Sequence, residues 1–312
     1  MPASSSIETV SGDSPNSTAQ AAQASPALRV PPAIDYDSPQ AISALLEAEG
    51  LAMRKRYGQN FLVARHARAR VMAEIGLEPG ASAWEIGPGI GAMTHPALET
   101  GARLSAFEID KGFAALLREA YGTVPGFALV EGDFLKTWRG ELAARGRPDR
   151  VFGNLPYNAA AAMVAALVEG LGVPERMVFM VQKEAARRMA AGPGTKDYAS
   201  FSVLCSSSCR VRVAFDLGAG AFWPQPRVAS SLVVMEARAD RAAEAGTREF
   251  GSFVRALFSS RRKTARNNLK PLGHSDEVIT AALASCGFRQ DVRGEALDPA
   301  ELLALYRAIG KP

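Results

Sequence analysis

The chain has 312 residues, 47% of them hydrophobic, and a formal net charge of +4 at pH 7. Its length exceeds the usual size of one domain, so we expect one large domain and a smaller one. It has no apolar run long enough to cross a bilayer, and its N-terminus lacks the pattern of a secretory signal. From these features we expect a soluble, cytoplasmic protein.

The N-terminal part changes character near Pro39. Residues 1–38 are rich in Ser, Ala, Pro, Thr and Gln and show no periodicity, so we predict a disordered tail. Beyond it, Ile42, Leu45 and Leu46 recur at helical spacing, which predicts a short helix ending at Gly50.

The middle of the chain alternates strand-like and helix-like segments. Stretches such as 111–121 and 158–170 have a helical pattern and separate the strands, which predicts an α/β fold with a doubly wound parallel sheet. Residues 211–217 and 227–237 leave no room for a helix between them, so they predict a closing antiparallel pair. The parallel strands are expected at 82–86, 103–109, 127–132, 150–154 and 176–182.

The chain beyond residue 245 is expected to form a small all-α domain after an alanine-rich polar linker. A first helix has an apolar stripe that includes Phe250, Phe253 and Leu257, and a second follows around Ile279. A third has Asp298 as its N-cap and ends at Gly310; Pro299 and Glu301 complete its capping box.

Cysteine and histidine are scarce. The three cysteines (Cys205, Cys209 and Cys286) form no CxxC pair, so neither a disulfide framework nor a metal site is indicated. The spacing of Cys205 and Cys209 suits one face of a helix, and we expect buried free thiols. The three histidines lie apart from any candidate nucleophile, which argues against a hydrolase.

Basic residues cluster in two acid-free stretches. Such clusters on a chain of low net charge indicate a polyanion-binding surface, although two solvated helical faces would look the same. The first stretch contains Arg54, Lys55, Arg56, Arg65, Arg68 and Arg70, and the second contains Arg255, Arg261, Arg262, Lys263, Arg266 and Lys270.

A glycine-rich loop, EIGPGIGAMT, follows the first strand of the predicted sheet. Gly87, Gly89 and Gly91 allow a tight turn and a close approach to a ligand, but a turn without a ligand uses the same residues. The spacing is GxGxG and no Lys-Ser/Thr pair follows, so a nucleoside cofactor without phosphates fits better than a nucleotide.

Acidic residues end the next two strands. Glu108 can accept hydrogen bonds from both hydroxyls of a ribose, although a strand-end glutamate is more often an ordinary exposed acid. Asp133 can accept from the amine of adenine, with Phe134 beside the ring, although an aspartate here can equally be a turn residue or helix cap. The succession of glycine loop, ribose acceptor and adenine acceptor predicts S-adenosylmethionine.

The fourth strand ends in NLPYN, from Asn154 to Asn158. An amine conjugated to a purine is a poor nucleophile, and the Asn154 side-chain oxygen and the Leu155 carbonyl could accept its two hydrogens and direct its lone pair at a methyl group. Pro156 would fix the turn, and Tyr157 would stack on the extruded base. The alternative is a strand-to-loop turn made of common turn formers.

Together these motifs resemble the ribosomal RNA adenine N6,N6-dimethyltransferases linked to kasugamycin sensitivity. KRYGQNFL, EIGPGIGAMT, EID, EGDF, NLPYN and FWPQPRVASSLV resemble the family's successive motifs, and VRALFSSRRKTARNNL resembles the helical domain of its small-subunit enzymes. The run NAAAAMV after Tyr157 is plainer than the family's usual helix start. The resemblance covers nearly everything from Pro39 onward and implies a Rossmann-like class I methyltransferase sheet with an antiparallel final strand.

The resemblance also implies site residues and a substrate. The substrate would be two adjacent adenosines in the 3′-terminal hairpin loop of small-subunit rRNA, each dimethylated, within a pre-30S or 30S particle late in assembly. The protein is expected to be a monomer. Cofactor contacts are implied at Asn60, Leu62, Gly87, Gly89, Glu108, Asp133, Phe134 and Asn154. Phosphate contacts are expected from the segment 54–70 and from a basic helix at 255–270 that carries Arg255, Arg261, Arg262, Lys263 and Arg266.

The expected organisation is a tail at 1–38, a helix and cofactor-covering segment at 39–60, a methyltransferase domain at 61–238 and a helical RNA-binding domain at 246–312. Two alternatives remain open. One is a large-subunit rRNA adenine methyltransferase conferring macrolide resistance, although such enzymes usually carry isoleucine where Leu155 stands. The other is a non-catalytic RNA-binding assembly factor, which would have no need of a cofactor pocket.

Overall fold

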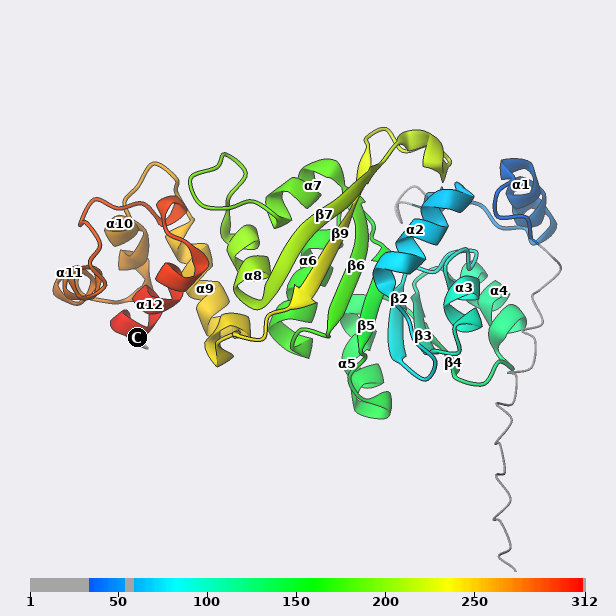
Figure 1. The fold of residues 1–312 in the computed structure, drawn as a ribbon, viewed down its shortest axis with the longest axis horizontal. Helices are drawn as coiled ribbons and strands as arrows, with labels where there is room; N and C mark the ends of the chain where they lie inside the picture. The colour runs from blue at the N-terminus through cyan, green and yellow to red at the C-terminus, as the bar shows by residue number, and fades with distance from the viewer. Residues whose placement is uncertain (1–33, 54–58, 311–312) are drawn as a thin grey trace, which may run out of the picture.

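The computed structural model describes residues 34–53 and 59–310 (Figure 1). Residues 1–33 of the tail predicted at 1–38, and the basic residues Arg54, Lys55 and Arg56, lie outside the described residues. Residues 34–38 of that tail are described, and Ser38 in it caps α1 (Pro39–Ala48) by accepting from the N–H of Ala41 at 3.2 Å. No helix within the described ranges is long and apolar enough to cross a membrane.

The strands are β1 (Phe61–Leu62), β2 (Ser82–Ile86), β3 (Arg103–Glu108), β4 (Phe127–Glu131), β5 (Arg150–Asn154), β6 (Arg176–Gln182), β7 (Cys209–Leu217), β8 (Phe222–Trp223) and β9 (Ser230–Ala237). The α-helices are α1 (Pro39–Ala48), α2 (Arg65–Ile75), α3 (Thr94–Glu99), α4 (Lys111–Tyr121), α5 (Phe134–Arg145), α6 (Ala160–Ala166), α7 (Lys183–Met189), α8 (Ser200–Ser208), α9 (Arg248–Leu257), α10 (Ala265–Leu269), α11 (Asp276–Ser285) and α12 (Pro299–Ile309).

The central sheet has seven strands in the order β4-β3-β2-β5-β6-β9-β7. Strands β2 to β6 pair in parallel, and β9 runs antiparallel to both β6 and β7. The predicted doubly wound sheet with a closing antiparallel pair is therefore confirmed. The predicted strands differ from the observed ones by at most a residue or so at their ends for the five parallel members.

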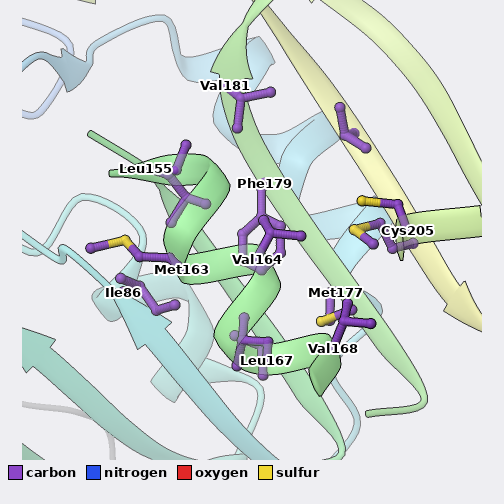
Figure 2. Close-up of a cluster of buried hydrophobic side chains, with 14 of the residues drawn as sticks. Ile86, Leu155, Met163, Val164, Leu167, Val168, Met177, Phe179, Val181 and Cys205 are labelled. Carbon is purple, nitrogen blue, oxygen red and sulfur yellow. The ribbon is translucent and has the colours of Figure 1, made fainter. Parts of the chain in front are cut away.

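Alternating residues of each strand supply the two halves of the core. In β6, Phe179 and Val181 belong to the layer between the sheet and α6, where Figure 2 shows Phe179 beside Val164. Their neighbours Val178 and Met180 belong to the opposite layer, against α2 and α3. Because both faces are covered, the strand RMVFMVQ is apolar almost throughout, as a central parallel strand should be.

The C-terminal helices α9 to α12 gather beside the β7 edge of the sheet (Figure 1). Phe250, Phe253 and Leu257 are buried in their shared core, to which Tyr198 and Val203 also contribute from the α8 region. Asp298 and Glu301 form the predicted capping box, with hydrogen bonds of 2.8 Å in both directions. The contacts of Tyr198 and Val203 join the C-terminal helices to the sheet through α8.

Two local predictions were wrong. Cys205 lies in α8 and Cys209 begins β7, so they do not share a helix face, although both are buried free thiols as expected. The basic segment 255–270 is not one helix, because α9 ends at Leu257 and α10 begins at Ala265. The amide of Asn268 donates to the carbonyl oxygens of Leu257 at 2.7 Å and Ser260 at 2.9 Å, which satisfies the end of α9 and holds the intervening loop.

A small second sheet was not predicted. β1 pairs antiparallel with β8, with Phe61 opposite Trp223 and Leu62 opposite Phe222. The N–H groups of Val63 and Ala64 extend the contact by donating to the carbonyl oxygen of Ala221 at 2.9 and 3.2 Å. This pairing ties the segment before α2 to the segment before β9.

Candidate active site

A cavity of about 310 Å³ opens at the carboxyl ends of β2 to β5. These strands are parallel neighbours, so the residues that follow them meet at one edge of the sheet. The cavity is lined by every residue predicted to bind the cofactor: Asn60, Leu62, Gly87, Gly89, Glu108, Asp133, Phe134 and Asn154. The structure therefore brings together residues that are up to a third of the chain apart in sequence.

The glycine loop needs glycine for two separate reasons. Gly87 and Gly89 have φ values of 71° and 57°, in the left-handed region that disfavours other residues. A Cβ on Gly89 would also lie 2.9 Å from Cε1 of Phe61, the strand residue that packs over the loop. The N–H of Gly89 donates to Oε2 of Glu108 at 3.0 Å, so the loop and the end of β3 hold each other in place.

Glu108 is a buried carboxylate whose two oxygens both accept backbone hydrogen bonds. Besides Gly89 on Oε2, the N–H of Asp110 donates to Oε1 at 2.8 Å. Only 4% of Glu108 is exposed, and this burial raises its pKa to about 7 despite the two donors. Each oxygen keeps a second lone pair for a donor inside the cavity.

Asp133 caps a helix, which was the alternative role considered for it, and it also lines the cavity. Its Oδ1 accepts from the N–H of Leu135 at 3.0 Å and caps α5. Phe134 is buried against Phe107, with ring centroids 5.0 Å apart, so the core fixes its ring at the cavity wall.

Glu85 was not predicted as a site residue. It lies in β2, lines the cavity and is 2% exposed, and its Oε2 accepts from the Thr94 hydroxyl at 2.6 Å. Burial and, to a smaller extent, the charge of Glu108 raise its pKa to about 8. The signal in the sequence was an acid inside the otherwise apolar strand SAWEI. Burying a carboxyl group in a strand costs free energy, so a buried acid often marks a functional site.

The Asn154 carboxamide is fixed in one orientation. Its Nδ2 donates to the carbonyl oxygen of Asn60 at 2.7 Å, so the nitrogen is engaged and Oδ1 is left as the acceptor. No described residue donates a hydrogen bond to this Oδ1. Leu155 follows with its side chain buried at 1% exposure between the sheet and α6 (Figure 2), and its N–H donates to Met180 at 3.1 Å.

Tyr157 is not among the residues that line this cavity, and its stacking on the extruded base stays a prediction. Pro156 and Asn158 line the cavity, whereas Tyr157 between them lines a second hollow of about 370 Å³ beside α6 and α9. Its hydroxyl is 2.9 Å from Oγ of Ser230, which is fully buried at the start of β9. The structure thus places Asn154 and Tyr157 on the same turn but on two different hollows.

The residues predicted to bind RNA differ in how they are engaged. Arg255, Arg261 and Arg266 form ion pairs with Glu169, Glu295 and Asp276. Arg262 and Lys263 are exposed in the loop before α10, and no ion pair joins either to a described residue.

Arg68, in the first basic stretch, is turned inward. It donates to the carbonyl oxygens of Leu62 and Val63 at 3.0 Å each and pairs with Asp37. Arg68 is therefore a structural residue here, whereas the side chains of Arg262 and Lys263 are exposed and could contact a polyanion.

Comparisons with known proteins agree with this geometry. Residues 50–309 match the family model described as ribosomal RNA adenine dimethylase. Ribosomal RNA small subunit methyltransferase A of Treponema denticola is 43% identical over 282 residues, covering 88% of this chain and 96% of the relative. The protein of the same name from Borreliella burgdorferi is 37% identical over 236 residues, covering 76% of this chain and 82% of the relative.

Two solved structures share the fold. A dimethyladenosine transferase from Plasmodium falciparum superposes with a TM-score of 0.67 at 20% identity, covering 78% of this chain and 94% of that one. The 23S rRNA methyltransferase ErmE superposes with a TM-score of 0.59 at 23% identity, covering 80% of this chain and 99% of that one. At these identities the likeness is one of fold alone.

Proposed function

The chain belongs to the ribosomal RNA adenine dimethylase family, and from this premise we propose that it dimethylates two adjacent adenosines in the 3′-terminal hairpin loop of small-subunit rRNA. Family membership makes it a methyltransferase that acts on adenine in rRNA. The hairpin, the pre-30S or 30S particle as partner, the cytoplasmic location and the monomeric state are the finer parts of the proposal. The relatives named for the small subunit support the choice of rRNA.

The cavity residues fit S-adenosylmethionine. When bound, this cofactor supplies an electrophilic methyl group on a cationic sulfur. Glu108 would accept hydrogen bonds from the ribose hydroxyls through the lone pairs that Gly89 and Asp110 leave open. Asp133 would accept from the adenine amine through Oδ2, since Oδ1 caps α5. Glu85 would face the cationic end of the ligand, because an ionised carboxylate buried this deeply is stabilised by a cation.

Asn154 would act by aligning the substrate amine. With Nδ2 held by Asn60, its Oδ1 would accept one hydrogen of the target amine, and the carbonyl oxygen of Leu155 would accept the other. Two such acceptors draw the nitrogen away from the plane of the purine, so that its lone pair no longer conjugates fully with the ring. Alignment of this kind requires no strong general base, and none of the histidines lines the cavity.

The orientation of the Asn154 carboxamide is the observation that carries this proposal. Substituting Asn154 by Ala should abolish methyl transfer to unmethylated small subunits while RNA binding is largely kept. Gln290→Ala, at an exposed residue outside the cavity, is the control and should retain transfer. A variant N154A with undiminished methylation would refute the assigned role.

The choice of rRNA has its own test. Mass spectrometry of both rRNAs from cells lacking the protein should show loss of dimethyladenosine from the small-subunit hairpin alone. Loss from large-subunit rRNA would instead favour the resistance-type enzyme. Unchanged methylation of both rRNAs would favour a non-catalytic assembly factor.

A further inference from the structure

The second hollow, of about 370 Å³, lies between α6, α7, α8 and α9. We call it the α6–α9 hollow and define it by six of its lining residues: Tyr157, Ala161, Gln182, Arg188, Phe201 and Val254. In Figure 1 these helices surround the junction between the sheet and the C-terminal helices. None of the residues assigned to the cofactor lines it.

The α6–α9 hollow is separated from the catalytic cavity by a single turn of chain. Pro156, Asn158 and Ala159 line the cavity, whereas Tyr157, Ala160 and Ala161 line the hollow. A strand that delivers one base to Asn154 therefore has the hollow within reach of the next position along it. This placement is the first argument for an occupant that is covalently continuous with the substrate.

The run of alanines after Tyr157 creates the space. Ala160, Ala161 and Ala165 of α6, together with Ala185 of α7, present only methyl groups to the hollow. Larger side chains at these positions would fill it. The plain helix start NAAAAMV thus has a structural consequence.

The walls of the hollow have the chemistry that recognises a nucleotide. The ring of Tyr157 is held by the hydrogen bond to buried Ser230, and Phe201 is half-buried near it, so aromatic side chains and apolar Val254 can contact a base. The Gln182 amide can both donate and accept at a base edge. Arg188 is exposed at the rim, where it can reach a phosphate.

We propose that the α6–α9 hollow binds the nucleotide adjacent to the target adenosine on the rRNA strand. This inference rests on the proposed function and adds a second base site to it. Because the proposed substrate is a pair of neighbouring adenosines, one would occupy the hollow while the amine of the other is at Asn154. The hollow would thereby set the register of the strand.

Filling the hollow with a side chain tests the proposal. Ala161 and Ala162 are adjacent exposed residues of α6, but only Ala161 lines the hollow. Ala161→Trp should raise the KM for unmethylated small subunits about tenfold, the loss expected when one base can no longer stack. Ala162→Trp, the matched control, should leave KM unchanged, and the affinity of both variants for S-adenosylmethionine, measured by calorimetry, should equal that of the unsubstituted protein.

A second measurement identifies the occupant. Binding of a synthetic hairpin RNA with two adjacent loop adenosines is compared with binding of the same hairpin carrying an abasic residue next to the target. The abasic change should weaken binding to the unsubstituted protein about tenfold and leave binding to the Ala161→Trp variant unchanged. Equal KM values for the two tryptophan variants, or an equal abasic effect on both proteins, would overturn the proposal. Absence of methyl transfer by the unsubstituted protein would instead count against the proposed function.

Discussion

Buried carboxyl groups should make cofactor binding strongly dependent on pH. Glu85 and Glu108 have pKa values raised to about 8 and about 7, chiefly because burial penalises their charged forms. Near pH 6 both are mostly protonated and neutral. Ionised carboxylates accept hydrogen bonds from a cationic ligand and attract its charge, whereas protonated carboxyl groups do not. Binding of S-adenosylmethionine should therefore release the protons of Glu85 and Glu108.

The size of the effect follows from the two pKa values. Lowering the pH from 7.5 to 6 reduces the ionised fraction of a group with a pKa near 7 by roughly 8-fold and that of a group with a pKa near 8 by roughly 24-fold. If both must be ionised, the affinity falls by about 200-fold over this interval, which corresponds to about 3 kcal/mol. The affinity is therefore greatest on the alkaline side and is lost as the pH falls.

Titration calorimetry at several pH values measures this directly. Repeating each titration in buffers of different ionisation enthalpy should show net proton release on binding. The Glu85→Gln variant should keep only the roughly 8-fold dependence that Glu108 contributes. A dissociation constant that is the same at pH 6 and pH 7.5, or proton uptake on binding, would refute the reasoning.

Three further predictions concern single residues. Gly89→Ala should lower both the free energy of unfolding, by about 1–2 kcal/mol, and the cofactor affinity, whereas Gly80→Ala, at a positive φ with open space around it, should lower only stability in urea titrations. Ser230→Ala should raise the KM for small subunits without changing cofactor affinity, because the Tyr157 hydroxyl loses its hydrogen-bond partner. Ser230→Thr keeps a hydroxyl and should restore the KM. Equal KM values for all three proteins would contradict a role of Ser230 in positioning Tyr157. Arg262→Glu should reduce the salt dependence of RNA binding by about one unit of slope with an unchanged melting temperature, and an unaltered slope would remove Arg262 from the interface.

Much of the candidate site could be predicted because it depends on local signals. Glu108, Asp133 and Asn154 each end an apolar run, and the rule that parallel strands end at one edge of a sheet is enough to bring them together. The glycines of the loop could be predicted in the same way, because few residues other than glycine adopt a positive φ. The lining of the cavity confirms that these residues converge.

The parts that were missed depend on contacts between distant segments. Strands β1 and β8 have two residues each, too short for a period, and become strands only by pairing with each other. The inward turn of Arg68 and the break between α9 and α10 likewise depend on carbonyl groups that the fold brings near. Helical spacing alone cannot reveal such partners, which is why a basic stretch looked like a continuous surface helix.

The β1–β8 pairing connects the wall of the candidate cofactor cavity to the chain that supports Tyr157 in the α6–α9 hollow. Phe61 packs over the glycine loop, while its partner Trp223 leads into the segment that delivers Ser230 to Tyr157. We expect a movement of Phe61 over the glycine loop to displace the segment that places Ser230 beside Tyr157. We expect the cofactor and the RNA to influence each other's dissociation through this tether, even though they would touch different walls of the protein.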